Sequence, residues 1–103
     1  MKQLYGYDID GVCSKKIEKK YPYVVISGRT GAEWNDGGLY AELAKDSPIF
    51  IRYKGAIGDR DDAGNFKAMM INYLGVTVFY EDEEYQANII RSQCPDCEVI
   101  IYK

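Results

Sequence analysis

Short apolar runs alternate with amphipathic stretches along this chain, and this alternation predicts a parallel α/β fold. Five runs are rich in the β-branched and aromatic residues typical of strands. They are Leu4–Ile9, Tyr23–Ser27, Ile49–Tyr53, Val76–Tyr80 and Glu98–Tyr102. The stretches at 24–26 and 76–79 are continuous rather than alternating, as in strands covered on both faces. We therefore expect one parallel sheet with helices packed on it.

Four stretches between these runs have helical character. In the clearest, apolar residues recur at i, i+3, i+4, i+7 and i+8 from Phe66 to Leu74, and Gly75 is placed to end the helix. We expect Met69, Met70 and Tyr73 to anchor this helix in the core. The other expected helices are Glu83–Ser92, Ala32–Lys45, which Gly37 and Gly38 weaken, and Cys13–Lys20, which has room for about two turns before Pro22.

Length and composition are those of an ordinary globular domain. The chain has 103 residues, of which 47% are hydrophobic and 28% charged. Residues 1–103 are therefore expected to form a single domain with its own core. Alternation of strands and helices at this length predicts a three-layer α/β sandwich around a five-stranded parallel sheet.

Charge and apolar content restrict the partners. The net charge of −3 gives no basic footprint for nucleic acid, although a local basic patch would be compatible with it. No apolar run is long enough to cross a membrane, and no secretory leader is recognisable. We therefore expect a cytoplasmic protein, and a homo-oligomer is compatible with the sequence.

The side-chain inventory limits the chemistry. The chain has no histidine, which excludes Ser-His-Asp and Cys-His nucleophile systems and histidine-ligated metals. Cys94 and Cys97 have the spacing of half a zinc site, but a structural zinc site needs about four ligands, and the only other cysteine is Cys13. We favour a turn with two partly buried thiols over a redox pair. Catalysis would therefore use carboxylates, lysine, hydroxyls and a hard cation bound through oxygen.

The densest candidate chemistry lies where the expected strands end. The first strand finishes in the segment Asp8–Gly11, whose two carboxylates, two residues apart, point to the same side of an extended chain. The second strand finishes in Ser27-Gly28-Arg29, and the fourth finishes in Glu81-Asp82-Glu83. Because ligands bind at the carboxyl ends of parallel strands, we expect these groups to form one site with Lys67.

These residues suit a phosphate ester bound next to Mg²⁺. Carboxylates from two strands provide the oxygen ligands that Mg²⁺ prefers, and several acids gathered without a cation would be strongly unfavourable. The Ser27 hydroxyl, nearby backbone N–H groups and the Lys67 ammonium are donors for phosphoryl oxygens. Each feature also has a simpler interpretation: a helix cap at Ser27, a solvated lysine at Lys67, and an acidic helix start at Glu81–Glu84.

The order of these motifs resembles that of the haloacid dehalogenase-like superfamily of phosphohydrolases. The matching segments are Asp8–Gly11 after its strand, Val24–Arg29, Lys67 and Val78–Asp82, so the resemblance covers nearly the whole chain. It implies a Rossmann-like core in which the first strand lies between the second and the fourth. That arrangement would place Asp82 beside Asp8.

The resemblance also implies a role for each residue in a Mg²⁺-dependent phosphatase. Asp8 would be the nucleophile that becomes an aspartyl-phosphate, and Asp10 would be the general acid and then the general base. A second aspartate at this position fits phosphatases rather than dehalogenases, which lack it. The binding residues would be Ser27, Gly28 and Lys67 for phosphoryl oxygens, and Asp8, Asp10 through its backbone carbonyl, Asp82 and Glu81 for Mg²⁺.

The chain departs from the family pattern in several places. Few residues separate Asp10 from the second strand, and no segment is long enough for a cap domain. A capless, open site suggests a large phosphorylated substrate that covers it, a partner chain that covers it, or weak activity. The fourth motif reads Glu81-Asp82 instead of Asp-Asp or Gly-Asp. We interpret Gly58–Gly64 as a solvated loop, and the alternative is a loop that reads substrate through Arg60.

Two other functions compete with a phosphatase. A non-catalytic binding or regulatory module could keep the fold and the acidic pocket. The reduced flap and missing cap favour it, and the presence of all four motifs opposes it. The other is a receiver-like domain phosphorylated on aspartate. Members of that class carry an acidic pair on the first strand and the phosphorylated aspartate on a later one, so the order of motifs opposes it.

Overall fold

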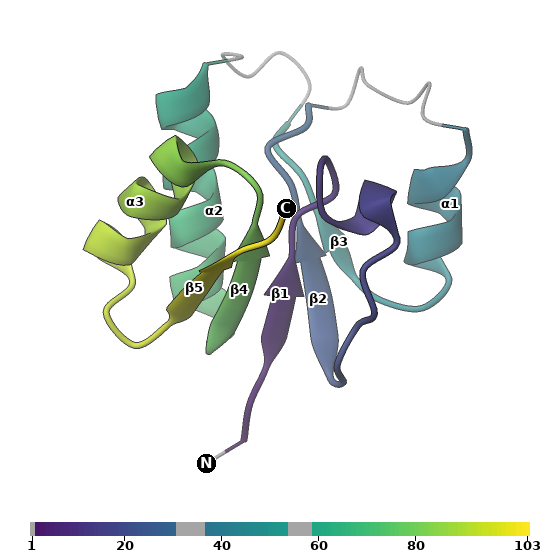
Figure 1. Cartoon of the computed structure of the whole chain (residues 1–103), viewed down its shortest axis with the longest axis horizontal. Helices are drawn as coiled ribbons and strands as arrows, with labels where there is room; N and C mark the ends of the chain where they lie inside the picture. Colours follow the sequence, from purple (N-terminus) through teal and green to yellow (C-terminus); the bar gives the residue numbers. More distant parts are fainter. Residues whose placement is uncertain (1, 31–36, 54–58) are drawn as a thin grey trace.

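The sheet is parallel throughout and has its first strand at the centre. The computed structural model describes residues 2–30, 37–53 and 59–103. Five strands within them pair in the order β3-β2-β1-β4-β5, and every pairing is parallel (Figure 1). The predicted strands and the central place of the first are confirmed. The strands are β1 (Tyr5–Tyr7), β2 (Tyr23–Ile26), β3 (Ile49–Phe50), β4 (Val78–Glu81) and β5 (Glu98–Ile101).

Both faces of β2 are buried, which explains its continuous apolar sequence. Tyr23 and Val25 belong to the core on one side of the sheet, and Val24 and Ile26 belong to the core on the other. All four side chains are buried. A strand in this position carries no polar alternation because neither face meets water.

The strand ends differ from the predicted ones at the edge that carries the site. The chain leaves the sheet after β1, because the Asp8 carbonyl accepts a hydrogen bond from the Cys13 amide at 3.1 Å. This turn leads into the 3₁₀ helix η1 (Cys13–Lys15). Strand β4 begins later than predicted and continues to Glu81, so Glu81 belongs to the sheet and Asp82 is the first residue beyond it.

Helices pack on both faces of the sheet. Figure 1 shows α2 (Arg60–Leu74) and α3 (Glu84–Gln93) together on one face, with η1 and α1 (Leu39–Ala44) on the other. The predicted helix at 83–92 is thus confirmed as α3. No helix within the described residues is long and apolar enough to cross a membrane.

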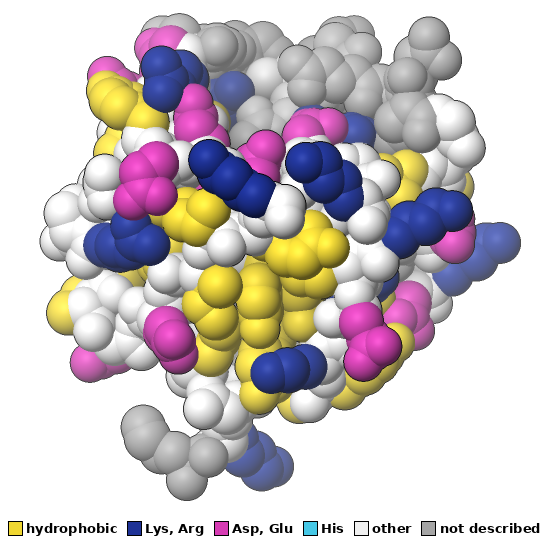
Figure 2. All heavy atoms as spheres, viewed as in Figure 1, with side chains coloured by type: hydrophobic (Ala, Val, Ile, Leu, Met, Phe, Trp, Pro, Cys, Tyr) yellow, Lys and Arg dark blue, Asp and Glu magenta, His cyan; other side chains and the backbone are white. Residues whose placement is uncertain are grey.

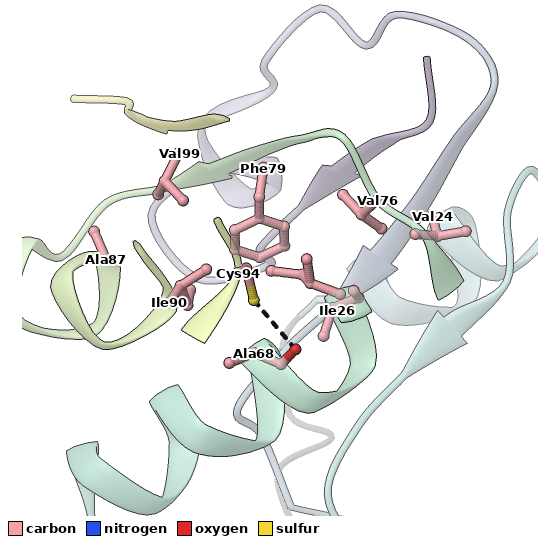
Figure 3. Close-up of a cluster of buried hydrophobic side chains, with 10 residues drawn as sticks. Val24, Ile26, Ala68, Val76, Phe79, Ala87, Ile90, Cys94 and Val99 are labelled. Carbon is pink, nitrogen blue, oxygen red and sulfur yellow. Dashed lines mark hydrogen bonds between the residues drawn. The ribbon is translucent and has the colours of Figure 1, made fainter. Parts of the chain in front are cut away.

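A hydrophobic core lies on each side of the sheet. Figure 3 shows the core between the sheet and helices α2 and α3, in which Phe79 and Ile90 are fully buried. In this core the Cys94 thiol donates a hydrogen bond to the Ala68 carbonyl at 3.4 Å. All three cysteines are free thiols, as expected from their number. The core on the other face contains Tyr7, Ile9, Val12, Cys13, Tyr23, Val25 and Leu43.

The start of α2 corrects the interpretation of the polar segment at 58–64 as a solvated loop. Gly58 lies outside the described residues, but Arg60 already begins the helix. Asp59 is the N-cap, and its carboxylate accepts a hydrogen bond from the Asp62 amide at 2.6 Å. Acidic residues in the first turn also suit the positive end of the helix dipole. The residues that suggested a loop therefore start a helix.

The inward face of α2 also differs from the prediction. Of the three expected anchors, Met69 is 57% exposed and Tyr73 is 82% exposed, whereas Met70 is partly buried against the core. At Gly64 the helix lies too close to α3 for a side chain, since a Cβ there would be 3.0 Å from an Ile89 methyl. Its buried residues are Ala63, Gly64, Lys67, Ala68 and Ile71.

The two weaker helix predictions are confirmed only in part. The expected helix at 13–20 is limited to η1, because Lys16 adopts a left-handed backbone conformation with φ of 57°. Of the expected helix at 32–45, residues 32–36 lie outside the described part of the chain. The rest contains α1, which begins directly after Gly38, so the two glycines precede the helix instead of interrupting it.

Packing against the centre of β1 gives a test of the fold. Gly6 pairs with Phe79, and a Cβ on Gly6 would lie 2.6 Å from the Phe79 ring. We expect Gly6→Ala to lower the free energy of unfolding in urea by about 1–3 kcal/mol, because the buried ring has to move. Adding Phe79→Leu should cost less in the Gly6→Ala chain than in the wild type. Equal costs in the two backgrounds would contradict the packing described.

Candidate functional site

Four buried polar side chains converge at the carboxyl edge of the sheet. Asp8 follows β1, Ser27 follows β2, Glu81 ends β4, and Lys67 reaches this edge from the middle of α2. Each of the four residues is less than 5% exposed. Burying polar and charged groups costs free energy unless they are hydrogen-bonded or paired, so the contacts among them decide whether this edge is stable.

Lys67 is the centre of these contacts. Its ammonium lies 2.7 Å from Glu81 Oε1, 3.2 Å from Asp8 Oδ2 and 2.8 Å from Gln86 Oε1. The three N–H donors of a lysine thus face three acceptors. The prediction that Lys67 turns toward Asp8 is confirmed, although Lys67 lies in the middle of its helix and not at the start. It is not the solvated lysine of the simpler interpretation.

Gln86 is a site residue that the sequence analysis missed. It lies in α3, which packs against α2, and its side-chain oxygen completes the set of partners of Lys67. No spacing rule connects a glutamine in α3 with a lysine in α2. The only signal was its place in the helix that follows the acidic end of β4.

Three acidic side chains form a group that could hold a metal ion. One carboxylate oxygen from each of Asp8, Glu81 and Asp82 lies within 4.8 Å of the others. Gly11 makes this approach possible: its φ is +81°, and a Cβ there would lie 2.0 Å from Asp82 Oδ2. The predicted neighbourhood of Asp82 and Asp8 is confirmed, and the identity of an ion is not fixed by these contacts.

Asp10 stands apart from this acidic group and pairs with Arg29. The guanidinium donates to both carboxylate oxygens, at 3.1 Å from Nε to Oδ2 and 2.9 Å from Nη2 to Oδ1. Arg29 is buried, whereas the Asp10 side chain is 66% exposed. Arg29 belongs to the second motif of the sequence, where no role was predicted for it. Metal binding through the Asp10 backbone carbonyl stays a prediction.

The Ser27-Gly28 turn lies against α2 next to Lys67. The Ser27 hydroxyl accepts a hydrogen bond from the Arg29 amide at 3.1 Å, so it fixes the turn and caps no helix within the described residues. A Cβ on Gly28 would lie 2.8 Å from the Ala63 side chain and 3.8 Å from Lys67 Cε. Glycine is therefore needed here for close approach, and the turn lies beside the end of the Lys67 side chain.

Lys67 and the three acidic side chains line one cleft of about 530 Å³ at the carboxyl edge of the sheet, and Gly28 lines it from the turn after β2. Lys and Arg side chains lie close to Asp and Glu side chains above the carboxyl ends of the strands (Figure 2). Glu83 contributes a buried oxygen, Oε1, with no hydrogen-bond partner in the described part of the chain. The lining includes Asp8, Asp10, Gly28, Arg29, Arg52, Arg60, Lys67, Glu81, Asp82, Glu83, Gln86 and Lys103.

Burial shifts the protonation of this cluster. Desolvation, together with the charge of Glu81, raises the pKa of Asp8 to about 8 against the opposing effect of Lys67. Desolvation also raises the pKa of Glu81. Burial alone would lower the pKa of Lys67, but the two carboxylates raise it. One ammonium between two carboxylates leaves an excess negative charge, which a proton or a cation can neutralise.

Comparisons of the chain with protein-family models, with curated proteins and with solved structures found no match. The chain is a small α/β domain with a five-stranded parallel sheet and a buried acidic group that could hold a metal ion. Any functional conclusion therefore rests on the residues and on the geometry of this edge.

The buried carboxyl of Asp8 should make stability depend on pH. In metal-free protein its pKa lies near 8, against an ordinary value of 3.8, so the folded state holds a proton that the unfolded state has lost. The free energy of unfolding should therefore fall by a few kcal/mol as the pH rises from about 4 to about 8. Urea unfolding in the presence of EDTA, repeated at several pH values in this range, measures this change in the free energy of unfolding.

Asp8→Asn should make this pH dependence shallower, although the raised pKa of Glu81 leaves part of it. Asp96→Asn, an exposed aspartate in the turn before β5, should leave the slope unchanged. A wild-type stability that rises between these pH values, or equal slopes in wild type and Asp8→Asn, would contradict the raised pKa of the buried Asp8 carboxyl.

Proposed function

We propose that this chain is a Mg²⁺-dependent phosphomonoesterase that forms an aspartyl-phosphate at Asp8. The observation that carries the proposal is the buried Asp8 carboxylate, 3.2 Å from the Lys67 ammonium and close to the Asp82 carboxylate. A carboxylate in this place can act as a nucleophile, and the ammonium beside it supplies positive charge for a phosphoryl group. The strand order and the motif order both agree with the resemblance to the haloacid dehalogenase-like superfamily.

The acidic group suits Mg²⁺. All of its ligand atoms are oxygens, which Mg²⁺ prefers. The Asp82 carboxylate occupies the space that a side chain at position 11 would need, and Gly11 leaves this space free. Glu81 already accepts hydrogen bonds from Lys67 and from the amides of Asp82 and Glu83. We therefore assign Asp8 and Asp82 as the main ligands, with Glu81 orienting Lys67. When bound, Mg²⁺ would supply positive charge for the phosphoryl oxygens.

The proposed reaction has two displacements at phosphorus. In the first, an Asp8 carboxylate oxygen attacks phosphorus, the bond to the ester oxygen breaks, and Asp10 gives the leaving oxygen a proton. In the second, Asp10 takes a proton from a water molecule that attacks the phosphorus of the aspartyl-phosphate. The phosphorus–Asp8 bond then breaks, which releases inorganic phosphate and restores the Asp8 carboxylate.

Other residues at this edge of the sheet would hold the phosphoryl group during these steps. The Ser27 hydroxyl and the Gly28 amide are donors on one side, and Lys67 is the donor on the other. Of the three acceptors of Lys67, Gln86 is the neutral one, so we expect a phosphoryl oxygen to replace it. The exposed Asp10 carboxylate fits a cleft that accepts large phosphorylated substrates.

One observation favours a second candidate, a binding module without catalysis. Both oxygens of Asp10 accept hydrogen bonds from Arg29, and a carboxylate held in this way has to turn before it can reach a leaving group. In a binding module the acidic group and Lys67 would bind a cation and a phosphate without turnover. Both candidates predict a bound cation, and hydrolysis of a phosphate ester separates them.

Mg²⁺ should bind at a single site, measured by isothermal titration calorimetry at pH 8. Asp82→Asn should weaken the binding by at least about tenfold, because it removes one of the charged ligands. Asp96→Asn removes the same charge from the opposite edge of the sheet and should bind Mg²⁺ like the wild type. Absence of binding in the wild type, or equal affinity in Asp82→Asn, would rule out this metal site.

Hydrolysis of p-nitrophenyl phosphate tests the reaction. Asp8→Asn should abolish turnover while the protein stays folded, because the amide has nearly the same shape but cannot attack phosphorus. Asp10→Asn should lower kcat by about 10²–10⁴-fold through loss of proton transfer. Equal turnover in wild type and Asp8→Asn would refute the mechanism. A wild type that binds Mg²⁺ and hydrolyses no ester of a broad phosphate-ester panel would favour the binding module.

A further inference from the structure

Arg52 connects the Ser27-Gly28 turn to helix α2. It follows β3 and is only 6% exposed. Its Nε donates to the Gly28 carbonyl at 2.7 Å, and its Nη1 donates to Asp62 Oδ2 at 2.6 Å. Its backbone N–H also donates to the Arg29 carbonyl at 2.9 Å. One residue therefore bridges the turn after β2, the end of β3 and the first turn of α2.

We infer that Arg52 is a positioning residue that sets the distance between the phosphate-binding turn and Lys67. This inference rests on the proposed phosphatase function. The turn supplies the Ser27 hydroxyl and the Gly28 amide, whereas α2 supplies the lysine. A phosphoryl group held between them needs both sides at a fixed separation. Arg52 spans the two sides directly, because its guanidinium touches the turn with one nitrogen and the helix with another.

The fit between the turn and the helix is tight enough for this separation to matter. A Cβ on Gly28 would lie 2.8 Å from the Ala63 side chain, so the turn already touches α2. Without Arg52 the turn loses a hydrogen bond to its carbonyl and a link to a charged group on the helix. Displacements of about 1 Å in a catalytic site can cost about 10²-fold in rate.

The geometry favours positioning over direct contact with substrate. The two guanidinium nitrogens named above donate to protein oxygens, and a planar fork can serve a carbonyl and a carboxylate at once. A lysine keeps the charge but reaches one of these acceptors at a time. Charge and geometry can therefore be separated by comparing Arg52→Lys with Arg52→Gln.

The test measures three properties of each variant: turnover of p-nitrophenyl phosphate, inhibition by orthovanadate, and Mg²⁺ affinity by calorimetry. In Arg52→Gln we expect kcat to fall about 10²-fold, KM to change much less, and the affinity for orthovanadate to fall with kcat. Mg²⁺ affinity should be unchanged, because Asp8 and Asp82 keep their places. Arg52→Lys should resemble Arg52→Gln.

Two controls remove the effects of helix charge and of losing an arginine. Asp62→Ala removes the carboxylate that Arg52 binds on α2 and should also lower kcat, by about tenfold. Asp61→Ala removes the same charge from the same helical turn and should leave kcat unchanged. Arg91 also bridges a carboxylate, Glu84, and a backbone carbonyl, Val99, at another place, and Arg91→Gln should keep wild-type activity.

The outcomes separate this inference from the proposed function. Wild-type turnover together with unchanged kcat in Arg52→Gln and Asp62→Ala would overturn the positioning role and leave the phosphatase intact. Full activity in Arg52→Lys with loss in Arg52→Gln would show that charge alone matters and would also overturn it. If Arg52→Gln does not fold, the comparison of kcat between Asp62→Ala and Asp61→Ala tests the positioning role, and equal kcat values in the two variants would overturn it. A wild type that neither turns over the ester nor binds orthovanadate would end both proposals.

Discussion

The buried Lys67 ammonium between Asp8 and Glu81 is the interaction on which the rest of the site depends. An ion removed from water costs several kcal/mol unless charged and polar partners surround it. Asp8 follows β1, Glu81 ends β4, Lys67 comes from α2, and Gln86 adds an acceptor from α3. Moving any one of these elements would leave a buried charge without its partner. The contact that supports the proposed chemistry therefore also fixes four elements relative to one another.

Close packing of small residues on α2 lets the Lys67 ammonium reach the carboxyl edge of the sheet. Gly28 meets Ala63 on α2, and Gly64 meets Ile89 on α3, at distances that leave little room for a further atom. A helix held this close at Ala63 and Gly64 buries small residues and the lysine stem at its first turns, and Ile71 is buried further along it. Met69 and Tyr73 are exposed on the same helix.

Arginines organise the parts of the cleft that the lysine does not reach. Arg29 holds the Asp10 carboxylate from one side, and Arg52 ties the turn before it to α2. Both guanidinium groups are buried while their carboxylate partners are more exposed. Such fork-shaped contacts give orientation as well as charge. The cleft thus combines a metal-compatible acidic group with cations that are already placed by the protein.

The resemblance in motif order implied the central place of the first strand and the position of Asp82 beside Asp8. The sequence by itself determined the parallel sheet and the gathering of the strand-end residues and Lys67 at one edge. These follow from local patterns, since strand composition is read over a few residues and parallel strands bring their carboxyl ends to one edge. Only the tertiary structure decided which face of α2 is buried, and which partners Gln86, Arg29 and Arg52 bind. Those contacts join segments far apart in the chain, and their geometry depends on how closely whole helices pack, which no local spacing encodes.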